Sequence, residues 1–239
     1  MTPNAATTFG SRADDFSLPA MIAAEIARVL TQQITFLKLQ PDARIIEEEL
    51  CTQFGVSRSP VREAFRMLEA DGLVVRTVRR GVRVAPMSRA NLDEVYACRV
   101  ALEGLAAAEA ARSAKSQTLA QLNEHLVDME EALNGRDVEL FFHSNAAMTR
   151  AIHAASGNST LIRIVAGIDQ QALRYRYLAH LRTQEILDLS LEGQRKVVAS
   201  IGACKPLQAR RQAESLIRRA HAVIARVLAE AYPGASNSE

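Results

Sequence analysis

The chain has 239 residues, of which 48% are hydrophobic and 23% charged, and its formal net charge is +2. This balance is typical of a packed globular protein of one large or two modest domains, and no apolar run is long enough for a membrane span. The first 18 residues lack the apolar core of a signal peptide, so we expect a cytoplasmic protein. Three widely spaced cysteines without metal-ligand spacing are expected to be small buried apolar residues: Cys51, Cys98 and Cys204.

The N-terminal segment predicts a tail followed by two helices. Residues 1–20 are rich in Thr, Asn, Ser and Gly, and we expect them to be disordered. Apolar residues then recur at helical spacing over residues 22–37, and a turn is expected at residues 41–42. Residues 47–54 predict a second, shorter helix.

Residues 55–70 are the most informative part of the chain. Gly55 supplies a permissive turn, Ser57 or Ser59 can cap a helix, and Pro60 falls in its first turn, where a missing N–H costs nothing. Its apolar positions form one buried stripe: Val61, Ala64, Phe65 and Leu68. Its arginines lie off that stripe, toward solvent: Arg58, Arg62 and Arg66. Such a helix suits the DNA major groove, where Arg can bond a guanine edge bidentately, whereas the alternative is a solvated basic face on an ordinary helix.

The next residues predict a basic hairpin, or wing. Two short β-rich runs, 73–76 and 82–85, flank a tip that contains Gly81. Residues 54–87 hold seven Arg against three acidic residues, a local net charge of +4, whereas residues 1–53 carry −3. A local basic patch on a near-neutral chain fits a surface that docks on phosphates. Four arginines crowd the wing: Arg76, Arg79, Arg80 and Arg83.

From Ser88 onward the sequence predicts helices alone. Helical spacing and its breaks indicate six of them: 90–112, 117–134, 137–156, 159–181, 184–203 and 206–231. Their short connections predict an antiparallel bundle. Apolar residues on more than one side of the bundle helices favour an oligomer. DNA-binding proteins with a helix-turn-helix usually act as two-fold dimers on inverted repeats. The expected division is a tail to residue 20, a DNA-binding domain over 21–87, a bundle over 88–232 and a tail over 233–239.

Four polar residues fall on the apolar stripes of the bundle helices: Arg99, Asn145, Thr149 and Gln194. Because a buried polar group costs a few kcal/mol unless it is partnered, they either satisfy one another or line a cavity that holds a polar ligand. Arg99 can also pair with Glu103, four residues on. Arg99 is the one clear inward charge, so it favours a small organic acid or another ligand with one acidic group. Three further residues would form the walls of the cavity: Tyr96, Met148 and Tyr175.

Two groups of residues resemble a known family. The run Gly55-Val-Ser-Arg-Ser-Pro-Val-Arg-Glu-Ala64, followed by Leu-Glu-Ala-Asp-Gly-Leu73 and Arg-Arg-Gly81, closely resembles the winged helix-turn-helix of GntR-type bacterial transcription regulators. Val95-Tyr-Ala-Cys-Arg-Val-Ala-Leu-Glu-Gly-Leu105 and Ala154-Ala-Ser-Gly-Asn158 resemble the helical effector domain (FCD) of the FadR branch, in its shorter VanR-like version with six helices. The resemblance covers about residues 21–232.

The resemblance implies a mainly α protein with an N-terminal winged helix-turn-helix and a C-terminal all-α antiparallel helical bundle that binds an effector and dimerises. It also implies the residues that contact DNA: Arg58, Ser59, Arg62, Arg66, Arg79, Arg80 and Gly81. Where many family members read DNA with an arginine, this chain has Glu48, so no contact is expected there. Where the family usually has glycine, this chain has Leu37 and Asp42, so the turn after its first helix is expected to differ slightly.

Many members of the family bind a divalent metal in the bundle through one Asp and three His. The matching positions here are Asn145, Thr149, Gln194 and Leu216, which are poor metal ligands or none. The five histidines of the chain do not rebuild the site, and each is expected at the surface or at a helix edge. We therefore expect no metal and no other cofactor.

These observations together predict a DNA-binding transcription regulator, a homodimeric repressor of an inverted-repeat operator. Its operator affinity would be controlled by a small organic acid held by Arg99, Asn145, Thr149, Gln194, Tyr96 and Tyr175. The alternative is a constitutive or architectural DNA-binding dimer without an effector. An enzyme is not expected, because no catalytic triad or pair of carboxylates falls at inward positions.

Overall fold

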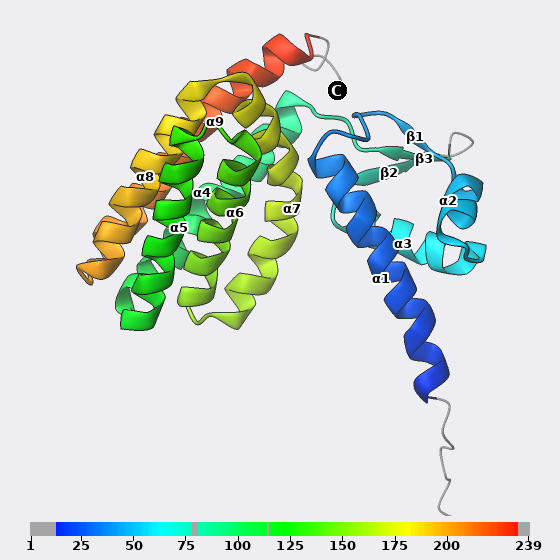
Figure 1. Ribbon diagram of the computed structural model, residues 1–239, viewed down its shortest axis with the longest axis horizontal. Helices are drawn as coiled ribbons and strands as arrows, with labels where there is room; N and C mark the ends of the chain where they lie inside the picture. The colour runs from blue at the N-terminus through cyan, green and yellow to red at the C-terminus, as the bar shows by residue number, and fades with distance from the viewer. Residues whose placement is uncertain (1–12, 78–80, 114, 234–239) are drawn as a thin grey trace, which may run out of the picture.

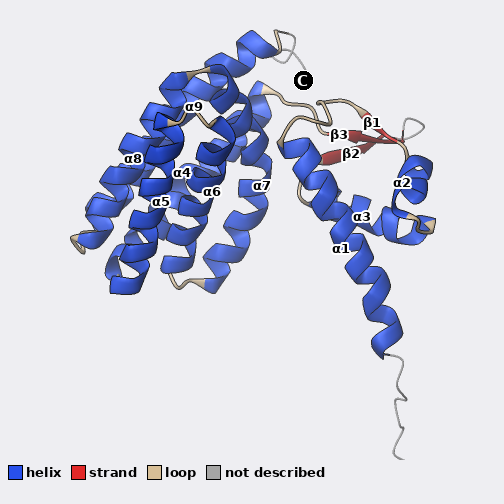
Figure 2. Ribbon diagram, in the orientation of Figure 1, coloured by secondary structure: helices blue, strands red, loops and turns tan. Residues whose placement is uncertain are grey.

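The computed structural model describes residues 13–77, 81–113 and 115–233. Over these residues the chain forms nine helices and one three-stranded sheet. They divide between an N-terminal domain of helices and strands and a C-terminal bundle of helices (Figures 1 and 2). The predicted fold class is confirmed.

The N-terminal domain is built around three helices: α1 (Ala13–Thr35), α2 (Glu47–Phe54) and α3 (Arg58–Ala70). α1 packs on α3 through buried apolar side chains that include Ile26, Leu30 and Phe65. Gly55 ends α2 with a φ of 64°, a left-handed conformation that glycine adopts without steric cost. The chain can therefore turn sharply into α3, as predicted.

α1 starts earlier than predicted. It begins at Ala13, so the expectation of a disordered tail up to residue 20 is wrong for residues 13–20, which are helical. The apolar stripe marks only the part of α1 that packs on its neighbours. Once that part is helical, each further residue adds a backbone hydrogen bond without a new nucleation cost, so the helix can extend beyond its packed portion.

The turn after α1 keeps a left-handed backbone at both positions where the resembled family usually has glycine. Leu37 has a φ of 53° and Asp42 a φ of 62°. The backbone of this turn therefore has the conformation that glycine would allow, and the difference from the family is a steric cost. A residue with a Cβ is destabilised by about 1–2 kcal/mol in this conformation.

The wing forms where it was predicted, to within one residue at each strand. β2 (Val74–Thr77) and β3 (Gly81–Val84) pair antiparallel, with Val74 opposite Val84. A third strand, β1 (Arg44–Ile45), pairs with β3, so the sheet order is β1-β3-β2. β1 was not predicted because two residues are too few to show an alternating pattern. The tip at 78–80 lies outside the described residues.

The bundle consists of six helices: α4 (Arg89–Arg112), α5 (Ser116–Asn134), α6 (Val138–Ala155), α7 (Ser159–Arg182), α8 (Gln184–Gly202) and α9 (Pro206–Ala231). Every boundary lies within one residue of its prediction. Four of these helices begin at a residue whose side-chain oxygen accepts a hydrogen bond from a backbone N–H of the first turn: Ser88, Asp137, Asn158 and Thr183. No described helix is both long and apolar enough to cross a membrane.

α4 lies at the centre of the bundle and contacts α6, α7, α8 and α9. Most of its apolar positions are buried within one chain, but Ala97, Cys98 and Ala101 are exposed. The prediction of an oligomer therefore stays a prediction.

The bundle holds the end of the wing through a buried arginine. Arg174 on α7 is 1% exposed and donates hydrogen bonds to the carbonyl oxygens of Ala85, at 2.7 Å, and Pro86, at 3.2 Å. These carbonyls belong to the short connection between β3 and α4. Next to it, Gly72 lies against the side chain of Gln171 on α7, where a Cβ would come within 2.9 Å of the amide carbon. The two domains are thus joined by specific contacts besides the peptide chain.

The prediction that the cysteines are buried is wrong for two of the three. Cys98 and Cys204 are exposed, and Cys51 is half-buried. Cys98 lies on an exposed face of α4 and Cys204 in the connection between α8 and α9, and composition alone does not determine either position.

Candidate DNA interface and bundle cavities

α3 presents its arginines to solvent from a rigidly packed helix. Val61, Ala64 and Leu68 are 0% exposed and fix one face of α3 in the core of the N-terminal domain. On the opposite face the side chains of the three predicted DNA-contacting arginines are 54–67% exposed: Arg58, Arg62 and Arg66. Ser59 is exposed beside them, and Ser57 occupies the N-cap position without a side-chain cap bond. The first-turn N–H groups of α3 can therefore face an anion.

Each of these arginines has an acidic neighbour, a feature that the sequence analysis missed. Arg58 donates from Nη2 to Oε1 of Glu48 at 2.6 Å, and Arg62 donates from Nε to both carboxylate oxygens of Glu47 at 3.0–3.1 Å. Both glutamates lie in the first turn of α2. Because such exposed pairs contribute only about 0–1 kcal/mol, DNA can displace them at little cost.

The wing carries a further arginine beside α3, since Nε of Arg76 lies 3.8 Å from a carboxylate oxygen of Glu69. Gly81 opens β3 with a φ of 76°, which explains the need for glycine at that position. Arg83 donates to the backbone carbonyl oxygen of Asp42 at 2.7 Å, so this arginine fixes β3 of the wing to the turn before β1. The predicted DNA contacts Arg79 and Arg80 lie outside the described residues.

Five of the predicted effector-binding residues line one cavity in the bundle: Tyr96, Arg99, Asn145, Thr149 and Gln194. The cavity has a volume of only about 30 Å³. Gln194 donates to the amide oxygen of Asn145 at 3.3 Å, and the Thr149 hydroxyl donates to the Asn145 carbonyl at 3.1 Å. The two interpretations left open by the sequence therefore coexist, since these side chains satisfy one another and also line a cavity.

Two residues expected in the walls of the cavity lie elsewhere. Tyr175 is 0% exposed, and its hydroxyl donates to the side-chain oxygen of Asn91 at 2.8 Å, near the start of α4. Met148 is buried in the apolar core of the bundle. The next residue on α7, Arg176, faces the cavity instead. One position along a helix turns a side chain by about 100°, so a small error in the assumed face exchanges one residue for its neighbour.

The charge of Arg99 is balanced inside the protein. Arg99 donates from Nη2 to Oε1 of Glu103 at 2.6 Å, and the other oxygen of Glu103 lies 3.2 Å from Nε2 of His153. Burial alone would raise the pKa of Glu103, but the charge of Arg99 and the contact with His153 lower it to about 2. The predicted pair between Arg99 and Glu103 is confirmed, and it leaves part of the guanidinium facing the cavity.

Two further residues of the cavity lie four positions apart on one face of α7. Arg176 is paired with Asp169 at 3.4 Å, and His180 follows four residues later on the same face. Nδ1 of His180 and the hydroxyl of Tyr96 are buried and have no hydrogen-bond partner among the described residues. Such groups cost about 1–3 kcal/mol each unless water or a ligand satisfies them, so the cavity favours a polar occupant.

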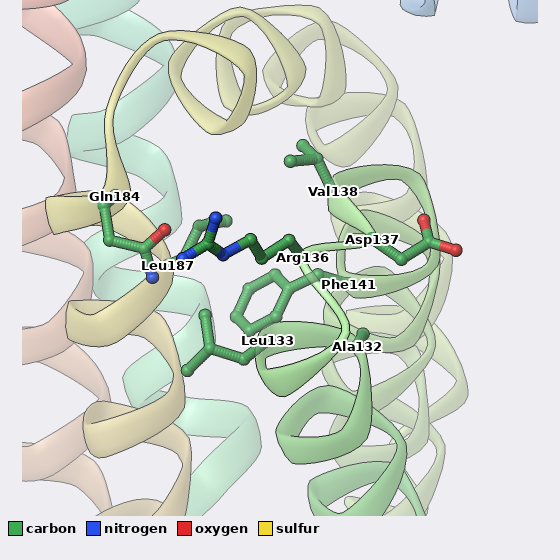
Figure 3. Close-up of a pocket in the computed structure, with 8 residues that line it drawn as sticks. All are labelled: Ala132, Leu133, Arg136, Asp137, Val138, Phe141, Gln184 and Leu187. Atoms are coloured by element: carbon green, nitrogen blue, oxygen red, sulfur yellow. The ribbon is translucent and has the colours of Figure 1, made fainter.

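A larger hollow of about 420 Å³ lies at one end of the bundle, between the α5–α6 connection and the start of α8. In Figure 3 the Arg136 side chain extends over Leu133 and Phe141 toward Gln184 and Leu187. None of the buried, unpartnered polar atoms found in the described part of the chain lines this hollow. It therefore has volume but little that would select a ligand.

Comparison with protein families decides the identity of both domains. The model for "Bacterial regulatory proteins, gntR family" matches residues 22–84, and the model for the FCD domain matches residues 94–219. The chain belongs to the GntR family. It is a GntR-family transcription regulator of the FCD type, and its relatives are regulators rather than enzymes.

Individual relatives agree with this assignment. The chain is 36% identical over 123 residues to the HTH-type transcriptional regulator YdhC of Bacillus subtilis, a match that covers 51% of this chain and 55% of YdhC. It is 29% identical over 187 residues to the "Probable D-xylose utilization operon transcriptional repressor" of Paenarthrobacter nicotinovorans, covering 77% of this chain and 80% of that protein. The structure of Escherichia coli McbR superposes with a TM-score of 0.75 at 23% identity, over 86% of this chain and 97% of McbR, so it has the same fold.

The donor set of this GntR regulator does not fit the metal that many FCD domains hold. Asn145, Thr149, Gln194 and Leu216 do meet at the bundle cavity, but the first three already bond one another and Leu216 offers no donor. Two histidines expected at the surface or at a helix edge are buried, because His153 contacts Glu103 and His180 packs against Phe141. Within the described residues, no group of three His, Cys, Asp or Glu side chains could hold a metal ion.

We expect the purified regulator to contain no stoichiometric zinc, nickel or manganese, because its four matching positions offer no free anionic or imidazole ligand. Elemental analysis of protein purified without chelator measures the content. Melting curves should coincide with and without EDTA. A 1:1 metal content together with a melt that EDTA lowers would contradict this expectation.

Proposed function

We propose that this GntR regulator is a cytoplasmic, homodimeric repressor that binds an inverted-repeat operator and releases it when a small organic acid enters the bundle cavity. The observation that supports it most is the exposed arginine face of α3 on a helix whose opposite face is fully buried. The names of two relatives, the D-xylose operon repressor and the repressor RspR of Escherichia coli, support repression.

In this proposal α3 enters the major groove. Arg58 and Arg62 exchange Glu48 and Glu47 for base edges, while Ser59 and Arg66 contact the phosphates beside them. Arg79, Arg80 and Gly81 carry the tip of the wing to the adjacent backbone or minor groove. Glu48 makes no DNA contact and serves as the resting partner of Arg58.

Replacing Arg62 by alanine should weaken operator binding by about 1–3 kcal/mol, roughly five- to 150-fold, and relax sequence preference at one base position. The operator is first selected from genomic fragments, and binding is then measured by fluorescence anisotropy at one fixed salt concentration. Arg195→Ala is the matched control, since it removes an equally exposed, glutamate-paired arginine from the bundle. Equal affinity and selectivity for Arg62→Ala and wild type would refute the assignment.

The proposed effector site is the cavity around Arg99 and Arg176. Both guanidinium groups line it, whereas their partners Glu103 and Asp169 line the small void on its other side. A carboxylate in the cavity would meet two cations, and its oxygens could accept a hydrogen bond from the unpartnered hydroxyl of Tyr96. At about 30 Å³ the cavity holds roughly two waters, so the bundle must open to admit an organic acid.

An organic acid that fits this site should raise the melting temperature of the wild type in a screen with an external dye. Tyr96→Phe should keep the fold, because it removes a buried hydroxyl that has no partner, and should weaken the ligand by about three- to tenfold. Arg99→Lys keeps the charge but loses the bidentate fork, so it should weaken the ligand further. An unchanged ligand response in both variants would place the ligand elsewhere.

One observation favours a second candidate, the constitutive DNA-binding dimer. The cavity is small, and Arg99 already has a full ionic partner in Glu103. If no organic acid stabilises the protein or changes operator affinity, this candidate replaces the first, while DNA binding through α3 stays in place.

A further inference from the structure

A second hollow of about 410 Å³ lies between the two domains, apart from the bundle cavity. α1 and α3 of the N-terminal domain line one side of it, and α6 and α7 of the bundle line the other. Figure 1 shows α1 and α7 as the neighbouring helices of the two domains. The volume falls within the range of about 300–1,000 Å³ that is typical of small-molecule sites.

Two buried polar atoms that line this hollow have no partner among the described residues. They are the hydroxyl of Thr35, a residue that is only 4% exposed, and the amide oxygen of Gln170. A threonine in a helix commonly donates to the carbonyl four residues before it, yet Thr35 makes no such bond. Each atom therefore needs a hydrogen-bonding partner in the hollow, either water or a ligand.

The rest of the lining selects the kind of occupant. Phe36 and Phe142 form an aromatic wall, with ring centroids 5.7 Å apart and planes at 71°. Arg150 lies at the rim and makes no ion pair or hydrogen bond within the described chain, whereas the other rim arginine, Arg28, is paired with Glu25. Asp71 is the one carboxylate in the lining, and it lies at the end of α3.

We propose that this hollow binds a small aromatic carboxylate that also carries a hydrogen-bond donor. The ring packs on Phe36 and Phe142, the carboxylate pairs with Arg150, and the donor satisfies the amide oxygen of Gln170. This site is distinct from the bundle cavity of the proposed function. Because its walls belong to both domains, an occupant holds α3 in one orientation relative to the bundle.

Indole-3-acetate is a suitable probe, since it combines an aromatic ring, a carboxylate and an N–H donor. Isothermal titration of the full chain should show saturable 1:1 binding. Arg150→Gln should weaken it by about ten- to 100-fold through the lost charge-assisted bond, and Gln170→Met by about three- to tenfold. Both variants should keep the fold, because Arg150 is exposed and the amide oxygen of Gln170 has no partner to lose.

Matched ligands and variants locate the binding. 1-Naphthaleneacetate lacks the N–H, so it should bind to wild type more weakly than indole-3-acetate does. Its affinity for Gln170→Met should be equally weak, and cationic tryptamine should not bind.

Two control variants lie in the other cavities: Arg136→Gln in the hollow of Figure 3 and Tyr96→Phe in the bundle cavity. Both should leave the affinity for indole-3-acetate unchanged. Absence of binding at millimolar concentration, or binding that Arg150→Gln and Gln170→Met leave unchanged, overturns the proposal. The operator test of Arg62 is unaffected by either result.

Discussion

Replacing Glu103 by alanine should lower the free energy of unfolding by about 3–5 kcal/mol, the cost of leaving a buried charge without its partner. The Arg99 and Glu103 side chains are 4% and 11% exposed, and their ion pair is 2.6 Å long. The same carboxylate also contacts His153 at 3.2 Å. Its loss therefore leaves a guanidinium and an imidazole in the core with no carboxylate between them. Urea denaturation at pH 7, followed by circular dichroism, measures the change.

A matched control is Glu130→Ala, which breaks a pair with Arg195 of similar length, 2.7 Å, at side chains that are 40% and 52% exposed. It should cost about 0–1 kcal/mol. The double variant Arg99→Met/Glu103→Leu should recover most of the stability, since removing both charges removes the penalty. Comparable losses for Glu103→Ala and Glu130→Ala would show that the buried pair has no special role.

Lowering the pH from 6.5 to 4.5 should destabilise the protein through His180 by about 2 kcal/mol. Burial, with a smaller contribution from the charge of Arg176, lowers the pKa of His180 from 6.5 to about 3. The unfolded chain therefore binds a proton below pH 6.5 that the folded protein does not accept until about pH 3. The stability is fully present above pH 6.5 and is lost progressively as the pH falls toward 3. The pKa of Glu103 is lowered to about 2, so the stability that its ionised carboxylate contributes is lost only below about pH 4.5.

Urea denaturation at half-unit steps between pH 7.5 and 4.5 measures this effect. His180→Leu, which cannot be protonated, should flatten the profile over this window. His143→Gln is the control, because the His143 side chain is 56% exposed, and it should leave the slope unchanged. A profile of the same slope in wild type and His180→Leu would contradict the assignment to His180.

The parts of the structure that local sequence signals determine were predictable. Four of the bundle helices begin at residues whose side chains bond the first turn, such as Ser88 and Asn158, and these residues can be recognised without knowledge of the fold. The buried stripe of α3 and the glycine turn before it follow in the same way. The match to the family's metal ligands also placed Asn145, Thr149, Gln194 and Leu216 at one cavity, although they come from three helices.

What depends on contacts between helices was not predictable. The exchange of Tyr175 for Arg176 at the cavity depends on the rotation of α7 about its axis, which is set by the bond of Tyr175 to Asn91 on α4. The burial of His180 follows from the same rotation. The partners of Arg58 and Arg62 lie ten and fifteen residues away on another helix, beyond the reach of any periodicity.

Those partners bear on how the regulator searches a genome. On a random stretch of DNA, phosphates must compete with Glu47 and Glu48 for arginines that are already neutralised, so fewer cations are released from the DNA on binding. At the operator, a guanine edge offers each arginine two directional acceptors, so it binds the arginine more strongly than a flexible surface carboxylate does. The glutamates should therefore shorten the time spent on the millions of incorrect sites more than the time spent on the correct one.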